Sequence, residues 1–585
     1  MKKFISYFLM ATVICLWGCQ DKLENEFKDP SVYSPTSEVV SGMFTRMMAN
    51  GRTGFMLNDY ADFWYQADGG YISHIELYGR YYRTAYTYLK DRADPKVGFG
   101  INGIQGHFNS LYTGFKEMPL LKIELAALSE TEQKDLAIYD VLTNMVYDMR
   151  ATMMVDIFND IPYSDALRGV EGLFFPKYDK GGDVYTTALA NIKTATDKLS
   201  GLYSAMTPEG KKKFEVQDII FQGDINKWIS YADAMRLRLA VRISGVKTDE
   251  AKTIIADVLS RGNLPTADIE MIPQDWFRSN QSTGDGGTFR RGMRERDYAG
   301  FVPPLLTEIM SRDGKDEYTQ GVDDPRMPVL FTGAKGSDIN AGVRIYRPID
   351  FDCVQGQKNL DELGHTYVTS YNYYVTPSLY FNNYYMCYNL ATFMWNHEPW
   401  YIFSVAELEL LKAEIAEKGL GNTGSSASQH IYNAVVSSTD YWYRHNEACV
   451  WPSVVTISAD ESAYLKPAKP SAAIIQTFAN VIKTNYEQAA GIEGKMEILM
   501  QQKFVHLNVH NSLELWTELR RTRHPKLNPL IYDPSTIINT CVERVTYPGS
   551  EAERNFENYA TVVEQDNFTS PIFWAGQNPV SYYKY

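Results

Sequence analysis

The sequence lacks the short motifs that mark several common kinds of active site. It contains no GxSxG nucleophile elbow, no GxxxxGK phosphate-binding loop and no HExxH zinc motif. It is also short of positive charge, because 57 lysines and arginines face 71 acidic residues, for a net charge of -14. Nucleic-acid binding needs a basic surface to neutralise phosphates, so the composition argues against that class of function.

Cysteine is scarce as well, with six in 585 residues and none in the CxxC spacing of a metal site. Four of them lie far apart in the main part of the chain: Cys353, Cys387, Cys449 and Cys541. The sequence leaves two readings open, one or two disulfides in an oxidising compartment or buried thiols. We predict no metal site and no cofactor.

Two patterns resemble ligand sites but lack the context that such sites need. Residues 98–103 fit GxGxxG, yet charged residues and Pro95 precede them where a dinucleotide site needs a strand. His506 and His510 are one helical turn apart, with no glutamate placed between them as in a zinc protease. We predict a structural glycine loop and two histidines that bind no metal.

The N-terminus has the pattern of a lipoprotein signal peptide. Lys2 and Lys3 precede an apolar run over 4–16, and the segment ends at Cys19. The run is shorter than the roughly 20 residues that a bilayer requires. We therefore predict a signal peptide at 1–18, acylation (palmitate or similar chains) of Cys19, and a lipid-anchored tether at 19–40.

Helical periodicity and helix caps dominate the rest of the chain. Ser129 and Ser404 are each followed three residues later by glutamate, as in a capping box, and Asp224 is a plausible N-cap. Proline or glycine follows each pattern. The sequence predicts helices over 129–159, 224–245, 404–419, 495–510 and 512–523.

The region between these helices loses the helical period. Residues 260–400 are rich in Gly, Asn, Tyr and Pro, which predicts a long irregular insertion, and the tail at 531–585 has the same character. No linker divides the chain. We predict a single, predominantly all-α domain over 41–585, with its helical scaffold at 41–250 and 400–530.

Aromatic clusters give the best indication of a binding site. Tyrosine (41) outnumbers phenylalanine (27), so much of the aromatic surface carries a polar tip. A sugar site needs an exposed aromatic platform beside polar groups, although such rings can instead pack the insertion against the helices. The candidate ligand-binding residues are Trp64, Tyr65, Tyr71, Trp276, Tyr373 and Trp395.

Paired carboxylates offer a competing reading as a glycoside hydrolase. Asp323 with Asp324 and Glu407 with Glu409 are two such pairs, and a glycosidase uses two carboxyl groups. Chance pairs are expected in a chain with 71 acidic residues. We predict no catalytic residue.

Four segments, in this order, carry a family resemblance: NDIPYSDAL at 159–167, DIIFQGD at 218–224 with the helix after it, AELELLKAEIA at 406–416, and QKF, ELW and RRTRHP within 502–525. With the lipoprotein signal, they resemble the SusD/RagB family of outer-membrane nutrient-binding lipoproteins. The resemblance implies a scaffold of tetratricopeptide-like helix pairs whose loop-rich insertions carry the ligand face.

The resemblance also implies a role and a partner. The protein would sit on the outer membrane facing the cell exterior, bind oligosaccharide and deliver it to a SusC-like TonB-dependent barrel. The alternatives are a peptide-binding lid, as in the RagB branch, and a surface-anchored glycosidase. The shared motifs read as scaffold, so we expect Arg236, Arg238, Arg520 and Arg521 to pair with helix carboxylates instead of ligand.

Overall fold

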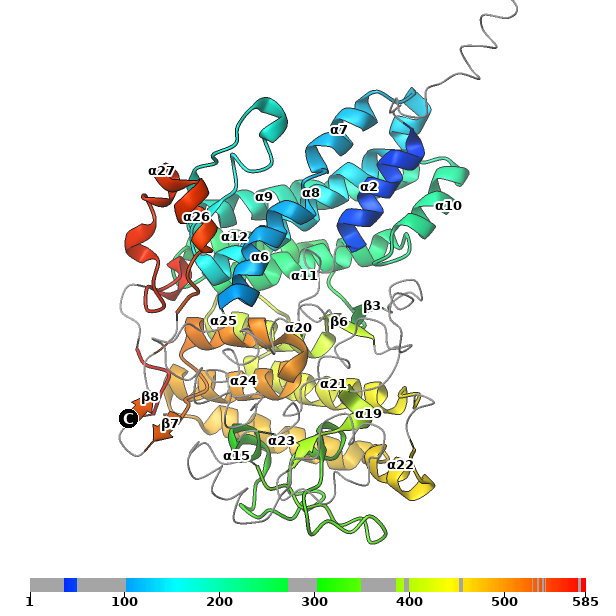
Figure 1. Cartoon of the computed structure of the whole chain (residues 1–585). Helices are drawn as coiled ribbons and strands as arrows, with labels where there is room; N and C mark the ends of the chain where they lie inside the picture. Colours follow the sequence, from blue (N-terminus) through cyan, green and yellow to red (C-terminus); the bar gives the residue numbers. More distant parts are fainter. Residues whose placement is uncertain are drawn as a thin grey trace, which may run out of the picture.

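The protein is predominantly helical. The computed structural model describes residues 36–49, 101–271, 302, 304–348, 386–393, 399–451, 456–528, 530–533, 536–538, 541, 543–576 and 580–584. Within these ranges, helices form two layers and every sheet has two strands (Figure 1). None of the described helices is both long enough and apolar enough to cross a bilayer. The predicted all-α class is confirmed.

The first layer holds the N-terminal helices, blue to green in Figure 1. Neighbouring helices pack against each other, with α8 against α9 and α11 against both α9 and α12. The elements are α2 (Ser37–Ala49), α6 (Ile101–Gly114), α7 (Met118–Ala126), α8 (Glu130–Phe158), α9 (Gly181–Ala205), α10 (Pro208–Gln217), α11 (Ile225–Ile243) and α12 (Thr248–Arg261).

Local sequence explains where the two central helices of this layer begin. Ser129 caps α8 in a capping box with Glu132, and Asp224 caps α11 by accepting from two main-chain N–H groups. At the start of α9, a Cβ on Gly181 would lie 2.6 Å from the Asn159 carbonyl oxygen. Only glycine therefore lets α9 begin this close to the end of α8.

The second layer holds the helices of the C-terminal half, yellow to orange in Figure 1. Here α20 packs against α21 and α24, and α21 packs against α23. The elements are α19 (Leu390–Phe393), α20 (Val405–Glu417), α21 (Ala427–Glu447), α22 (Ala459–Leu465), α23 (Ala472–Gln488), α24 (Gly491–Leu507), the 3-10 helix η3 (Asn508–Asn511) and α25 (Ser512–Thr522).

The helix predicted over 495–510 is only partly right. The helix α24 begins four residues earlier, at Gly491, and ends at Leu507. Asn508 stops it, since its φ is 45° and its side chain accepts a hydrogen bond from the main-chain N–H of Val509. Asparagine tolerates positive φ better than most residues, which suits it to this break.

The described parts of the predicted insertion have short elements only. Besides α19, the helices are α15 (Pro304–Met310) and α16 (Met327–Leu330). The antiparallel pairs are β3 (Ile269–Met271) with β6 (Trp400–Phe403) and β4 (Phe331–Thr332) with β5 (Cys387–Tyr388). Two further pairs lie elsewhere: β1 (Ile161–Pro162) with β2 (Tyr178–Asp179), and β7 (Leu530–Asp533) with β8 (Thr536–Ile538).

The C-terminal segment returns to the first layer. Tyr547 donates to the carbonyl oxygens of Phe158 and Asp160 at the end of α8, and Trp574 Nε1 donates to Asp156 at 2.8 Å. This segment contains α26 (Gly549–Arg554), α27 (Phe556–Tyr559), η4 (Val563–Gln565) and η5 (Phe573–Ala575), drawn in orange-red to red beside the first layer in Figure 1. The 3-10 helix η5 packs against α9 of the first layer and α25 of the second, so this segment contacts both layers.

Three of the four cysteines are described, and no disulfide joins any two of them. Cys387 and Cys449 are buried, and Cys541 Sγ lies 3.8 Å from Ser581 Oγ. Cys353 lies outside the described residues. The reading as buried thiols therefore fits Cys387 and Cys449.

Candidate functional site

The aromatic candidates lie outside the described residues: Trp64, Tyr65, Tyr71, Trp276, Tyr373 and Trp395. Cys19 also lies outside them. Their assignment as ligand-binding residues and as the lipidation site stays a prediction. The described residues do show how the interior of the helical scaffold is built.

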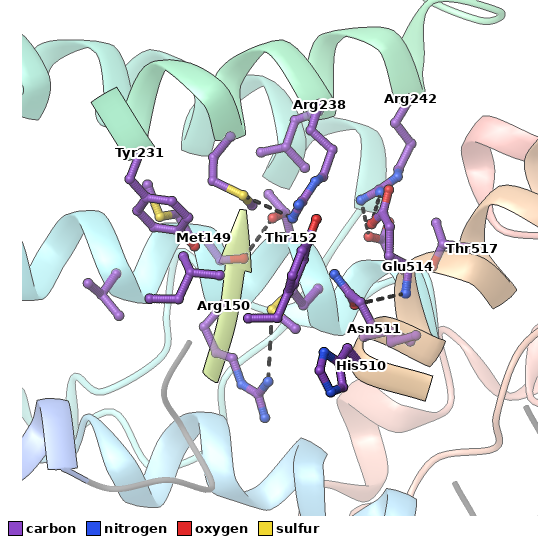
Figure 2. A pocket seen from close by; sticks show the side chains of 18 residues that line it. Met149, Arg150, Thr152, Tyr231, Arg238, Arg242, His510, Asn511, Glu514 and Thr517 are labelled. Atoms are coloured by element: carbon purple, nitrogen blue, oxygen red, sulfur yellow. Dashed lines mark hydrogen bonds and ion pairs between the residues drawn. The ribbon is translucent and has the colours of Figure 1, made fainter. Parts of the chain in front are cut away.

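A cavity of about 60 Å³ lies where the two layers meet (Figure 2). Five elements line it, α8, α11, β6, η3 and α25, and they contribute charged side chains such as Asp156, Arg242 and Glu514. The cavity has room for a few water molecules. It is far smaller than the roughly 300 Å³ or more of a pocket for an organic ligand, so it is not the site for an oligosaccharide.

A buried ion pair crosses the layers beside this cavity. Arg238 on α11 donates from Nε and Nη2 to the two carboxylate oxygens of Glu407 on α20, both at 2.7 Å. Tyr401 also donates to Glu407. The predicted capping box at Ser404 is therefore half right, because Ser404 caps α20 but the Glu407 side chain turns to Arg238 instead of the cap.

A second ionic contact joins three helices. Arg242 on α11 donates to Asp156 on α8 at 2.7 Å and to Glu514 on α25. All three side chains are buried. Burial acts to raise the pKa of Glu514, but Arg242, Arg238 and Lys503 outweigh it and hold that pKa below its usual value. The carboxylate is thus kept charged inside the protein.

A third network lies within the second layer. Arg521 donates to Glu414 at 2.6 and 2.8 Å and to Glu518 at 2.6 Å, and Lys503 Nζ lies 3.0 Å from Glu518. Burial acts to raise the pKa of Glu414, yet Arg521 and Lys418 bring it down to about 2. Every charge in this network has an opposite charge beside it.

The scaffold role predicted for four arginines is confirmed for three of them. Arg236 pairs with Asp233 and Asp257, and Arg238 and Arg521 pair with glutamates as described above. Arg520 differs, since it donates to the main-chain carbonyl oxygens of Asp156 and Glu543, both at 2.7 Å. It therefore joins the end of α8 to the C-terminal segment.

The histidine pair behaves as part of the core. His506 lies between the hydroxyls of Ser404 and Ser438, at 2.6 and 3.0 Å, and His510 packs against Trp442 and Phe393. Burial lowers the pKa of His506 to about 3, so the ring stays neutral near pH 7. Among the residues that the structure describes, no cluster of three potential metal ligands occurs.

Neither carboxylate pair has the arrangement of a glycosidase site. Asp324 is paired with Arg326 at 2.6 Å, while Asp323 accepts main-chain hydrogen bonds at 2.7 and 2.8 Å. Burial acts to raise the pKa of Glu409, but His430, at 2.8 Å, and other donors bring it down to about 2. A general acid needs a raised pKa, so Glu409 is unsuited to that role.

Asp148 on α8 differs from these carboxylates because its pKa is raised. It is buried, and it accepts a hydrogen bond from Tyr163 Oη at 2.5 Å, while the rings of Tyr147 and Tyr163 stack. Burial raises the pKa of Asp148 from 3.8 to about 7, and hydrogen bonds from Tyr163 and Asn191 oppose this only in part. Ionising Asp148 in the folded protein is therefore costly.

This cost predicts a pH dependence of stability. The folded protein keeps the Asp148 proton up to about pH 7, whereas the unfolded chain releases it near pH 4. The contribution of Asp148 to stability should therefore fall as the pH rises from about 4 to about 7, and then stay level. Asp148→Asn removes the titration and keeps an acceptor for Tyr163, so at pH 8 the variant should be about 4 kcal/mol more stable than the wild type.

Urea unfolding between pH 4 and pH 8 measures this difference, which should shrink toward zero at the acid end. Asp249→Asn, at an exposed position on α12, is the matched control and should show no such trend. A constant difference between Asp148→Asn and wild type across the range would contradict the prediction.

Sequence reasoning singled out Arg238 and His510 among the residues around the cavity. It missed Asp156, Arg242 and Glu514, although α11 carries a usable signal. Trp228 and Met235 are buried on α11, and Arg242, seven residues beyond Met235, occupies the same face of the helix. A charge on a buried stripe requires a partner from another element. The sequence does not reveal that the partners are Asp156 and Glu514.

Solved structures of similar fold cover nearly the whole chain. A chitin-binding protein is 20% identical, with a TM-score of 0.65 over 92% of this chain and 100% of its own. A chitin-binding SusD homolog from Flavobacterium johnsoniae is 18% identical, with a TM-score of 0.61 over 92% and 99%. A SusD homolog from Bacteroides fragilis is 17% identical, with a TM-score of 0.57 over 86% and 99%.

No curated protein matches the chain. A family model does match, over residues 82–548, and its description is "Starch-binding associating with outer membrane". This match spans most of the sequence and agrees with the fold. The protein therefore belongs to the SusD-like family.

Proposed function

We propose that this protein is a lipoprotein on the outer face of the outer membrane, which binds an oligosaccharide and delivers it to a SusC-like TonB-dependent barrel. The family match over 82–548 carries the proposal, because its description combines starch binding with the outer membrane. The chitin-binding proteins of similar fold support a carbohydrate ligand. Acylation of Cys19 would supply the anchor.

The scaffold supports a ligand face that lies outside its interior. The cavity between the layers is too small for a sugar, and the ionic side chains around it bind one another. Met271 at the end of β3 faces Trp400 at the start of β6 in the strand pair. Met271 and Trp400 are therefore neighbours at the edge of the described scaffold.

Two other functions remain to be tested against this one. A peptide ligand fits the RagB branch, and the net charge of -14 would favour basic peptides. A glycosidase would need two acids in one cleft, and the carboxylates of the two pairs predicted from the sequence are bound to other groups. We therefore favour a binding protein without turnover.

Removing an aromatic platform should weaken ligand binding. We expect Trp64→Ala, Trp276→Ala or Trp395→Ala to lower affinity for starch or chitin oligosaccharides by about tenfold each, because an aromatic ring at the centre of a binding surface contributes about 1–2 kcal/mol. Calorimetry on the unlipidated Cys19→Ser protein measures this. Phe556→Ala, an exposed ring on the scaffold, is the control and should bind as wild type does.

Delivery to a barrel is tested separately, by purifying the tagged full-length protein from its native membranes in mild detergent. We expect stoichiometric recovery of a TonB-dependent barrel. Recovery of no barrel even after crosslinking, or release of shortened sugars from the oligosaccharide, would contradict the proposed function.

A further inference from the structure

The cavity between the two layers is lined by charged and polar side chains as well as apolar ones (Figure 2). Five of the lining residues are arginine, aspartate or glutamate: Arg150, Asp156, Arg238, Arg242 and Glu514. A cavity that stays dry in a protein is normally apolar, whereas a polar cavity of sufficient size holds water. At roughly 10–15 Å³ for each molecule, a volume of about 60 Å³ has room for about four waters.

The carboxylate of Glu514 uses only one of its two oxygens for hydrogen bonds within the described part of the chain. Its Oε2 accepts from Arg242 Nη2. Its Oε1 is buried and accepts from no described residue, since even Lys503 Nζ lies 3.8 Å away, beyond hydrogen-bond distance. A charged oxygen in the interior is costly without its donors. Glu514 Oε1 therefore requires a donor from outside the described side chains.

The guanidinium of Arg242 has an unused donor beside this unused acceptor. Its Nη1 donates to Asp156 at 2.7 Å, and its Nη2 donates to Glu514. Its Nε is buried and donates to no described residue. Both side chains line the same cavity. Because a water molecule donates and accepts, water in this cavity can bond both atoms.

Neutral polar groups on the cavity wall offer further partners for water. Asn511 accepts from the main-chain N–H of Glu514 at 3.4 Å through Oδ1, and its NH2 group can donate to another acceptor. Thr152 donates to the Met149 carbonyl oxygen at 2.7 Å, and its Oγ1 can still accept. A buried water typically makes about three hydrogen bonds, which these donors and acceptors can supply.

The charges around the cavity favour water over an ion. Three arginines and two acidic residues line it, and a third acid, Glu407, is bound to Arg238 at 2.7 Å. Their formal charges cancel. His510 also lines the cavity and stays neutral, because burial holds its pKa well below the usual value. No counter-ion is therefore needed, and an apolar molecule would leave Glu514 Oε1 and Arg242 Nε without hydrogen bonds.

We propose that this cavity is a hydration site, in which an ordered cluster of about four water molecules bonds Glu514 Oε1 and Arg242 Nε. The cluster is a structural part of the junction between α8, α11 and α25. It completes the hydrogen bonding of an ion pair whose direct contacts leave one donor and one acceptor unused, and it thereby lowers the cost of burying these charges. The proposal is independent of which ligand the protein carries.

A high-resolution crystal structure of the wild-type protein tests the site directly. We expect ordered water within about 3.2 Å of both Glu514 Oε1 and Arg242 Nε. Crystals soaked in sodium bromide distinguish water from a halide, since bromide gives an anomalous signal and water does not. A bromide peak in the cavity, or no density beside the two atoms, would overturn the inference.

A matched pair of variants tests the same site in solution. Thr152 and Thr143 both lie on α8, are fully buried and donate to a helix carbonyl oxygen at 2.7 Å, but Thr152 lines the cavity and Thr143 does not. Urea unfolding should show that Thr152→Val raises the unfolding equilibrium constant about fivefold more than Thr143→Val, because only the first removes a partner of the water cluster. An equal or smaller effect of Thr152→Val would indicate a dry cavity wall and contradict the proposal.

Discussion

Replacing Arg242 with methionine should lower the free energy of unfolding by about 3–5 kcal/mol, the range for removing one partner of a buried ion pair. Arg242 bonds Asp156 on α8 and Glu514 on α25, and all three side chains are at least nine-tenths buried. Methionine fills similar space, so the loss comes from charge. Two carboxylates would remain in the interior with their shared cation gone, at the junction of the two layers.

Urea unfolding of the purified protein measures this loss. The triple variant Arg242→Met, Asp156→Asn, Glu514→Gln should recover much of it, because no net charge is then left uncompensated. Arg168→Met is the matched control, since Arg168 also bonds two carboxylates but does so on the surface. It should unfold as wild type does. A loss of less than about 1 kcal/mol for Arg242→Met alone would show that the ionic contact does not support the junction.

The elements that sequence reasoning placed correctly are those with local causes. The start of α8 follows from Ser129 and Glu132, and the start of α11 from Asp224, because a cap acts on N–H groups two or three residues away. Helix ends were less predictable. The break at Asn508 depends on a backbone conformation that its own side chain supports, and nothing in the apolar period marks it.

Contacts between distant segments could not be predicted from the sequence, for a different reason. Arg238 and Glu407 are 169 residues apart, and the spacing of Glu407 from Ser404 suggested a capping role instead. The contact between the C-terminal tail and α8 through Tyr547 likewise joins segments that are far apart in the sequence. Such pairings depend on how the two layers pack against each other, and no local pattern in a single sequence encodes that packing.

The residues of the ligand site were also difficult to predict from the sequence. Aromatic clustering selected candidates such as Trp64 and Trp395 on chemistry alone, and both lie outside the described residues. The described scaffold indicates where a sugar does not bind, because its cavity is small and ionic. What the family match adds is the class of function, and the identity of the ligand has to come from binding experiments.

The DIIFQGD segment at 218–224 is held together by the buried carboxylate of Asp218. Asp218 is fully buried, and its carboxylate accepts from the main-chain N–H groups of Ile220, Phe221 and Gly223 at 3.0 to 3.2 Å. It also accepts from Trp228 Nε1 at 2.7 Å. A single side chain thus satisfies four buried donors at the entry to α11.

Asp218→Ala should therefore lower the free energy of unfolding by about 3–5 kcal/mol, because leaving each buried donor without a partner costs about 1–3 kcal/mol and the loop can relax to recover some of it. Asp218→Asn keeps one acceptor oxygen but turns an NH2 group toward the donors, so its loss should be smaller. Asp224→Ala removes the nearby partly exposed N-cap and serves as the control, with an expected loss of about 1 kcal/mol. Urea unfolding ranks the three variants. If Asp218→Ala is no worse than Asp224→Ala, the segment does not act through its buried carboxylate, and its place in the family pattern needs another explanation.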